Sequence, residues 1–151
     1  MTTALDVAKY FIFKANQVGS FLSNLKLQKL VYYAQAWYLA NYKKPLFAEK
    51  FEAWIHGPVQ PELYSEFKSF RWLPIDLDVE EIPASITKDI ADFLDEVVEA
   101  YFKYDGLDLE IMTHNELPWI EARKGISPDK SSKEIISEET MQTFYSDLLN
   151  A

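Results

Sequence analysis

A repeat of apolar residues at helical spacing near the N-terminus is the strongest periodic signal in the chain. It lies in the segment LKLQKLVYYAQAWYLA, residues 25–40, and Ser23 is a favourable N-cap just before it. The apolar positions recur at spacings of three and four. They are Leu27, Leu30, Val31, Ala34, Trp37 and Tyr38. Because aromatic stripes of this kind normally face a core, we predict a helix whose stripe packs into the protein interior.

Capping signals and helical spacing predict further helices on both sides of this segment. Thr3 and Asp6 fit a capping box for a first helix that stops near Gly19. Pro61 suits the first turn of another helix, and Ser137 caps a last helix over about residues 138–149. Between them we predict helices at 85–104, ended by Asp105-Gly106, then at 107–114 and at 118–125.

A different pattern separates these helices in the first half of the chain. Residues 46–56 alternate loosely and predict a small extended or β element, with Trp54 anchored in the core and a turn at Gly57-Pro58. The chain has 151 residues, no internal repeat and no low-complexity linker. We therefore predict a mainly α protein, a compact single-domain helical bundle over residues 1–151.

Composition narrows the functional classes. No apolar run approaches the roughly 20 residues that span a bilayer, and the N-terminus does not resemble a signal peptide. Cysteine is absent, which excludes disulfides and thiolate sites, so we expect a cytoplasmic protein with no membrane partner. Residues 1–75 carry a charge of +4 and residues 76–151 a charge of −13. An acidic chain repels phosphate backbones, so we expect no direct nucleic-acid binding. The acidic residues of the second half either form a solvated surface or attract a basic protein partner.

Signals for catalysis are sparse. His114 and Glu116 form an H-x-E, but the P-C-x-x-C that accompanies it in zinc deaminases is absent. There is no H-E-x-x-H, no glycine-rich phosphate loop and no G-x-S-x-G. One enzymatic alternative stays open, a metal-dependent hydrolase that uses His56 and His114 with Glu52 and Glu116. The sequence favours a protein that is not an enzyme and needs no cofactor.

Four motifs in a fixed order carry a resemblance to a known family. They are LKLQKLVYYAQ, PLF, EAWIHGPVQP and THNELPW. This order resembles the Panacea antitoxin domain, also described as SocA-like and as phage-associated GepA-like, over about residues 5–125. We interpret most of the matching residues as structural. They are Leu27, Lys29, Leu30, Tyr33, Gln35, Trp54, Gly57, Pro58, Pro61, Thr113, His114, Glu116, Pro118 and Trp119.

The resemblance implies a function that composition does not reach. Members of the family neutralise a small toxin encoded beside them, as a rule by direct protein–protein contact, and are not understood as enzymes. Delivery of the toxin to a protease, or binding of a host factor by a phage-derived adapter, are open alternatives. An added N-terminal DNA-binding domain, present in some members, is not expected here because the first predicted helix begins near residue 4.

Interfaces are typically anchored by large aromatic side chains, which suggests where a toxin binds. Tyr32 lies away from the apolar stripe, so we expect its side chain to be exposed, and Trp72 lies in a connecting loop without an obvious core partner. We predict a toxin-binding surface formed by Tyr32, His56, Tyr64 and Trp72. The second choice is an acidic strip on the helix predicted at 85–104, formed by Asp89, Asp92, Glu96 and Glu99.

Overall fold

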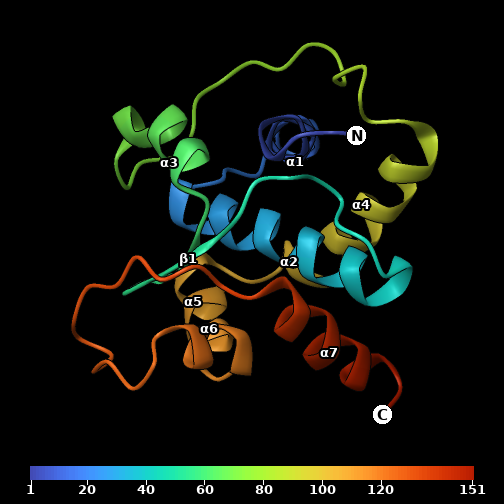
Figure 1. Ribbon diagram of the computed structural model, residues 1–151. Coiled ribbons are helices and arrows are strands. Elements are labelled where there is room, and N and C mark those ends of the chain that lie inside the picture. Colours follow the sequence, from blue (N-terminus) through green and yellow to red (C-terminus); the bar gives the residue numbers. More distant parts are fainter.

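Seven α-helices, one 3₁₀ turn and one β-hairpin make up the computed structural model, which describes residues 1–151 (Figure 1). The elements are α1 (Ala4–Gln17), α2 (Asn24–Tyr42), β1 (Glu52–Trp54), β2 (Gly57–Val59), α3 (Pro61–Phe67), η1 (Lys68–Phe70), α4 (Lys88–Tyr101), α5 (Gly106–His114), α6 (Leu117–Ala122) and α7 (Glu138–Leu149). The prediction of a mainly α protein with a small β element is confirmed.

Side-chain caps fix where several helices begin. The Thr3 hydroxyl accepts from the amide of Asp6, and the Ser23 hydroxyl accepts from the amide of Lys26, both at 3.1 Å. Ser137 caps α7 in the same way. Each hydroxyl satisfies one of the backbone donors that a helix start leaves without an intrahelical partner. These three caps were predicted and are confirmed because they depend only on local sequence.

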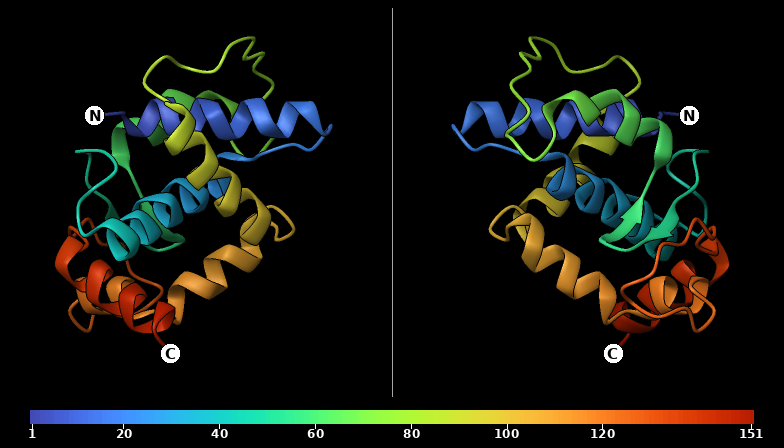
Figure 2. Two further views of the ribbon diagram at one scale, coloured as in Figure 1. Left: turned by 90° about the vertical axis from the view of Figure 1, so that its right-hand side faces the viewer. Right: turned by 90° about the vertical axis from the view of Figure 1, so that its left-hand side faces the viewer.

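Helix α2 runs through the middle of the molecule, with α1, α4, α5 and α7 packed around it (Figures 1 and 2). Fourteen of its 19 residues are buried, including polar ones such as Lys29 and Gln35. The predicted stripe belongs to a single cluster of 35 buried hydrophobic residues, with Trp37 and Tyr38 packed against its edge. Helix α2 therefore has almost no face in contact with solvent.

The burial of Tyr32 is one consequence of this enclosure of α2. Only 1% of its surface is exposed, and its ring meets that of Phe51 edge-on with the centroids 5.3 Å apart. Its hydroxyl lies 3.2 Å from the hydroxyl of Tyr145 on α7. The predicted exposure of Tyr32 is wrong, because the prediction assumed that the helix keeps a solvent-facing side.

A group that we call the tyrosine cluster fills the space between α2, α4, α6 and α7. Its members are Tyr32, Tyr33, Tyr101, Glu116 and Tyr145. The hydroxyls of Tyr33 and Tyr145 donate to the same carboxylate oxygen of Glu116, at 2.8 and 2.7 Å. Burial raises the pKa of Glu116, and these two hydrogen bonds oppose that rise. The Glu116 carboxylate, at the start of α6, thus joins α2 to α7, and Tyr101 of α4 stacks on Tyr33.

The hairpin is antiparallel and short, with Ala53 opposite Pro58 in its register. It occupies residues 52–59, slightly later than predicted, and residues 46–51 before it are irregular. The amide side chain of Gln35 replaces strand pairing there, because it donates to the Phe47 carbonyl at 2.8 Å and accepts from the Leu46 amide at 2.7 Å. The segment before α7 completes the outer edge of the hairpin through an isolated bridge between Glu52 and Ile135.

The predicted role of Asp105-Gly106 is wrong. Helix α4 already ends at Tyr101, and Asp105 caps the following helix instead. Its carboxylate accepts from the Asp108 amide at 2.8 Å, and the Asp108 carboxylate accepts from the Asp105 amide at 3.2 Å. This reciprocal capping box makes Gly106 the first residue of α5 rather than the residue after a helix.

The remaining long connection, residues 71–87, crosses over α1 before it enters α4 (Figure 1). It is attached to the first helical pair by the Ile75 amide, which donates to the Leu22 carbonyl at 2.8 Å. The side chain of Asn16 also donates to the Leu77 carbonyl at 2.9 Å. No helix combines the length and hydropathy that a bilayer crossing requires.

Candidate protein-docking cleft

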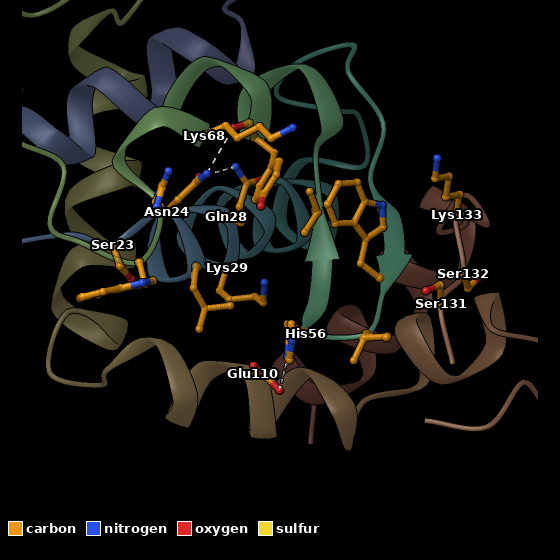
Figure 3. Close-up of a pocket in the computed structure, with 17 residues that line it drawn as sticks. Ser23, Asn24, Gln28, Lys29, His56, Lys68, Glu110, Ser131, Ser132 and Lys133 are labelled. Carbon is orange, nitrogen blue, oxygen red and sulfur yellow. Dashed lines mark hydrogen bonds and ion pairs between the residues drawn. The ribbon is translucent and has the colours of Figure 1, made fainter. Parts of the chain in front are cut away.

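An open cavity of about 850 Å³, which we call the docking cleft, lies where the N-terminal end of α2 meets the hairpin and α3 (Figure 3). Five separate segments form its walls. They are residues 23–29 of α2, residues 54–59 of the hairpin, residues 64–72 of α3 and the turn after it, Glu110 of α5, and residues 131–133 before α7. A volume of this size is in the range of ligand and peptide pockets.

Three of the four residues predicted to bind the toxin line this cleft. They are His56, Tyr64 and Trp72. Trp72 is 81% exposed, a high fraction for a large aromatic side chain. His56 is also exposed, and its Nδ1 lies 3.1 Å from the Glu110 carboxylate. Tyr32, the fourth, lies in the tyrosine cluster and does not reach the cleft.

Trp54 stands in the wall of the cleft, not in the core where it was predicted. Residues alternate sides along a strand, and it is Ala53 that points inward and is fully buried. The Trp54 ring is half-buried and meets the Tyr64 ring at 5.1 Å between centroids. Its indole N–H donates to the Glu52 carboxylate at 2.8 Å, which fixes the ring orientation.

Three amide side chains hold α3 in place beside the cleft. The Gln28 carbonyl accepts from the Gln60 backbone amide at 3.0 Å, and the Gln28 amide donates to the Asn24 side chain at 3.0 Å. Asn24 in turn donates to the Tyr64 carbonyl at 3.2 Å. Gln60 caps α3 by accepting from the Leu63 amide, and Pro61 occupies the first turn as predicted. The position of Tyr64 is therefore set by buried hydrogen bonds from α2.

Lys29 borders the cleft, and its side chain is fully buried. Its ammonium donates to the Pro58 carbonyl at 3.1 Å. Burial lowers the pKa of Lys29 to about 7, and the Glu110 carboxylate opposes this shift.

Gly57 is required by the same lysine. Its φ of +101° is rarely adopted by residues with a side chain, and an added Cβ would lie 2.5 Å from Cε of Lys29 and 2.9 Å from the Thr113 hydroxyl. The buried lysine and the hairpin turn therefore fit together only when residue 57 is glycine.

A stack of side chains from α5 and α6 supports the hairpin from behind. The His114 ring is stacked on the Trp119 ring, with 4.1 Å between their centroids. The Arg123 guanidinium also lies over the Trp119 ring, 4.8 Å from its centroid. The Trp119 indole donates to the Trp54 carbonyl at 2.8 Å, and Arg123 donates to the Ala53 carbonyl at 2.8 Å. Burial lowers the pKa of His114, in keeping with a neutral ring in this stack.

Comparison with known proteins connects these features to a family. Residues 27–120, more than half of the chain, match the family model described as antitoxin SocA-like, Panacea domain. The chain belongs to this family. The matched residues include most of α2, the hairpin and α3, which form much of the cleft wall, whereas residues 131–133 of the wall lie outside the match.

A named relative is similar to this Panacea domain over a shorter stretch. Antitoxin SocA from Caulobacter vibrioides (strain NA1000 / CB15N) is 41% identical to it over 66 residues. The alignment covers 44% of this chain and 35% of the relative, so the similarity spans about a third of the relative's length. No solved structure matches the Panacea domain described here.

Three basic residues at the rim of the cleft were not among the predicted site residues of this Panacea domain. They are Lys68, Arg71 and Lys133, and all three are exposed. No motif or periodicity marks them, because they lie on a 3₁₀ turn, in a connecting loop and in a polar loop. Arg71 has one local signal, its position next to Trp72, which the sequence did identify.

The alternative of a metal-dependent hydrolase finds no support in the geometry of the Panacea domain. No three His, Asp or Glu side chains come together in an arrangement that could hold a metal ion. His56 pairs with Glu110, and His114 is stacked on Trp119. Glu116 accepts two tyrosine hydroxyls and Glu52 accepts the Trp54 indole, so neither carboxylate is directed at a histidine.

Proposed function

We propose that this Panacea domain is an antitoxin that binds a toxin encoded by a neighbouring gene and neutralises it by direct protein–protein contact through the docking cleft. Membership of a family named for an antitoxin supports the class of function. The name of the Caulobacter relative supports it as well. The single observation that carries the location is the exposure of Trp72 beside Tyr64 and Trp54 in one cleft.

The chemistry of these rings supports a protein as the ligand. Tryptophan and tyrosine are enriched at the energetic centres of protein interfaces, because they bury a large area at a small cost in side-chain entropy. Trp54 and Tyr64 are held by hydrogen bonds and by each other, so their positions are set before a partner arrives. Preorganised anchors of this kind lower the entropic cost of binding.

The first test is to express each neighbouring gene alone and together with this protein. We expect one neighbour to stop growth of the host, co-expression to restore growth, and the two proteins to co-purify. If no neighbouring gene product is toxic, the antitoxin function is wrong for this chain. A rescued culture without a stable complex would contradict neutralisation by binding, and the half-life of the toxin would then show whether it is delivered to a protease.

Alanine variants locate the contact. Trp72→Ala and Tyr64→Ala should each weaken toxin binding by more than about 1 kcal/mol, which is typical of interface anchors. His56→Ala should have a smaller effect because its ring is already paired with Glu110. Leu148→Ala, an exposed apolar residue on α7 outside the cleft, is the matched control. Unchanged binding in all three cleft variants would move the contact elsewhere, with the acidic strip at Asp89 and Asp92 as the next surface to test.

A further inference from the structure

The charge of the docking cleft is opposite to that of the chain as a whole. The chain has 15 Lys and Arg against 24 Asp and Glu, a net charge of −9. The residues that line the cleft include four basic side chains and a single acidic one, Glu110. An acidic protein therefore concentrates positive charge around one aromatic cavity, where it focuses the field on an incoming ligand.

The three cations at the rim have no partner inside the molecule. The structure contains five ion pairs, and none of them involves Lys68, Arg71 or Lys133. Their side chains also donate no hydrogen bond to another residue, in contrast to the buried Lys29 below them. Lys68 and Lys133 lie on different sides of the cleft (Figure 3). Anionic groups on either side of a bound segment would therefore find an unoccupied cation.

Arg71 occupies a backbone position that favours glycine. The Leu73 amide donates to the Phe70 carbonyl at 3.0 Å, which closes a tight turn with Arg71 and Trp72 at its two central positions. Arg71 has φ 56° and ψ −125°, close to the values of the first central residue of a type II′ turn, where glycine is the usual residue. An arginine in that conformation costs backbone energy, and its side chain forms no internal hydrogen bond or ion pair that would offset the cost.

We infer that the docking cleft binds an acidic, apolar segment of its protein partner, in which Asp or Glu residues flank a large hydrophobic side chain. This inference rests on the proposed function for the existence of the partner and adds its chemistry. The hydrophobic side chain packs between Trp54, Tyr64 and Trp72. The flanking carboxylates pair with Lys68 on one side and with Lys133 on the other, and Arg71, in the turn that follows Lys68, offers a further cation. Arg71 offers the planar fork that binds a carboxylate through two hydrogen bonds.

Reversing the charge of the cleft rim and measuring toxin binding tests whether the bound segment is acidic. The double variant Lys68→Glu/Arg71→Glu should weaken toxin binding at least tenfold at low salt and reduce its salt dependence. The double variant Lys44→Glu/Lys103→Glu changes the net charge equally at two exposed lysines outside the cleft, and should change binding less than twofold. If the toxin is bound and neutralised equally well by both variants, the antitoxin function stands and the acidic segment is wrong.

Arg71→Gly separates recognition from folding. Glycine adopts the backbone angles of residue 71 without strain, so the melting temperature should be unchanged or higher. Toxin binding should nevertheless weaken several-fold. Binding equal to that of the unmodified protein would show that the arginine side chain makes no contact with the partner and would overturn its assigned role.

A peptide titration tests the inference without any toxin. The probes are two blocked peptides with a central Phe, flanked on each side by two Glu in one peptide and by two Gln in the other. The Glu peptide should shift the indole NMR signals of Trp54 and Trp72, which line the cleft, and leave those of Trp37 and Trp119, which do not line it, in place. The Gln peptide should cause smaller shifts. Equal shifts by both peptides, or no shift at all, would overturn the inference even if a toxin is found.

Discussion

The tyrosine cluster and the docking cleft both combine aromatic rings with charged groups and both border α2, yet they differ in whether their polar atoms are paired. In the cluster, Glu116 accepts from Tyr33 and Tyr145, and the Trp37 indole donates to the Tyr101 hydroxyl at 2.6 Å. In the cleft, three cations have no partner and Trp72 is largely exposed. Buried polar groups must be paired because an unpaired one is costly, whereas groups at the surface keep their hydration.

The difference suggests a division of labour along one helix. The middle of α2 contributes to a closed network that specifies the fold, and its N-terminal end contributes to an open site. Changes in the cluster should therefore reduce stability, and changes at the cleft rim should reduce binding at almost constant stability. The following four predictions test this separation in order of decreasing effect.

Glu116→Leu should have the largest effect on stability. It removes the acceptor of two buried hydroxyls, and each unsatisfied group costs about 1–3 kcal/mol, so we expect a loss of about 4 kcal/mol. Glu116→Gln is the matched control, because it keeps one acceptor oxygen and removes the buried charge, and it should cost less than about 1 kcal/mol. Urea unfolding of both variants measures this, and equal losses would show that the hydroxyls do not depend on this acceptor.

Gly57→Ala should destabilise the protein by about 3 kcal/mol, through a strained φ and a collision with Lys29. Gly19→Ala is the control, since Gly19 also has a positive φ of +65° but no atom within 4 Å of the added Cβ. It should cost only about 1 kcal/mol from backbone strain. Thermal and urea unfolding compare the two, and similar losses would mean that Lys29 moves aside at no cost.

Lys29 should make stability increase with pH above neutrality. Its pKa is about 7 in the folded chain and near 10.5 in the unfolded chain, so between these values the unfolded chain holds one more proton. The free energy of unfolding should then rise by up to about 1.4 kcal/mol per pH unit, while below pH 7 both states are protonated and the slope disappears. Glu110 and His114 are the titratable groups that interact with this lysine.

The measurement is urea unfolding between pH 7 and 9.5. Lys29→Met should reduce the slope, and Lys44→Met, at an exposed lysine without hydrogen bonds or ion pairs, controls for the loss of one positive charge. An identical slope in both variants would contradict a depressed pKa at Lys29.

Trp72→Ala should have the smallest effect on stability, less than about 0.5 kcal/mol, because its ring is 81% exposed. The same change should have one of the largest effects on toxin binding. Urea unfolding and titration with the toxin give the two values. A loss of stability of more than 1 kcal/mol would show that the ring contributes to the fold and would weaken the contrast between cleft and cluster.

Local signals explain most of what the sequence predicted correctly. The caps at Thr3, Ser23 and Ser137, the proline at the start of α3 and the positions of the helices depend on neighbouring residues, so they can be read from short segments. The exposure of Trp72 could also be judged locally, because it is an isolated aromatic residue in a loop. That His56, Tyr64 and Trp72 bind a toxin stays a prediction.

The errors arose where burial depends on distant segments. Tyr32 is polar enough to face solvent on an ordinary helix, but α7, whose Tyr145 is more than 100 positions away, covers that side of α2. The basic rim was missed for the same reason, since Lys68 and Lys133 border the same cleft only when the polar loop before α7 folds against the hairpin. Asp105 was misread because the same residue type serves at the end of one helix and at the start of the next.

The family match ends at residue 120, but the interior of the molecule does not. Tyr145 supplies one of the two hydroxyls that Glu116 accepts, and the Ile136 amide donates to the Phe51 carbonyl at 2.8 Å. The stretch that is inherited as a recognisable module and the stretch that folds as a unit are therefore different lengths of the same polypeptide. A relative that exchanged its C-terminal segment by recombination would have to replace both the hydroxyl that reaches Glu116 and the apolar side chains, such as Met141, that complete the core.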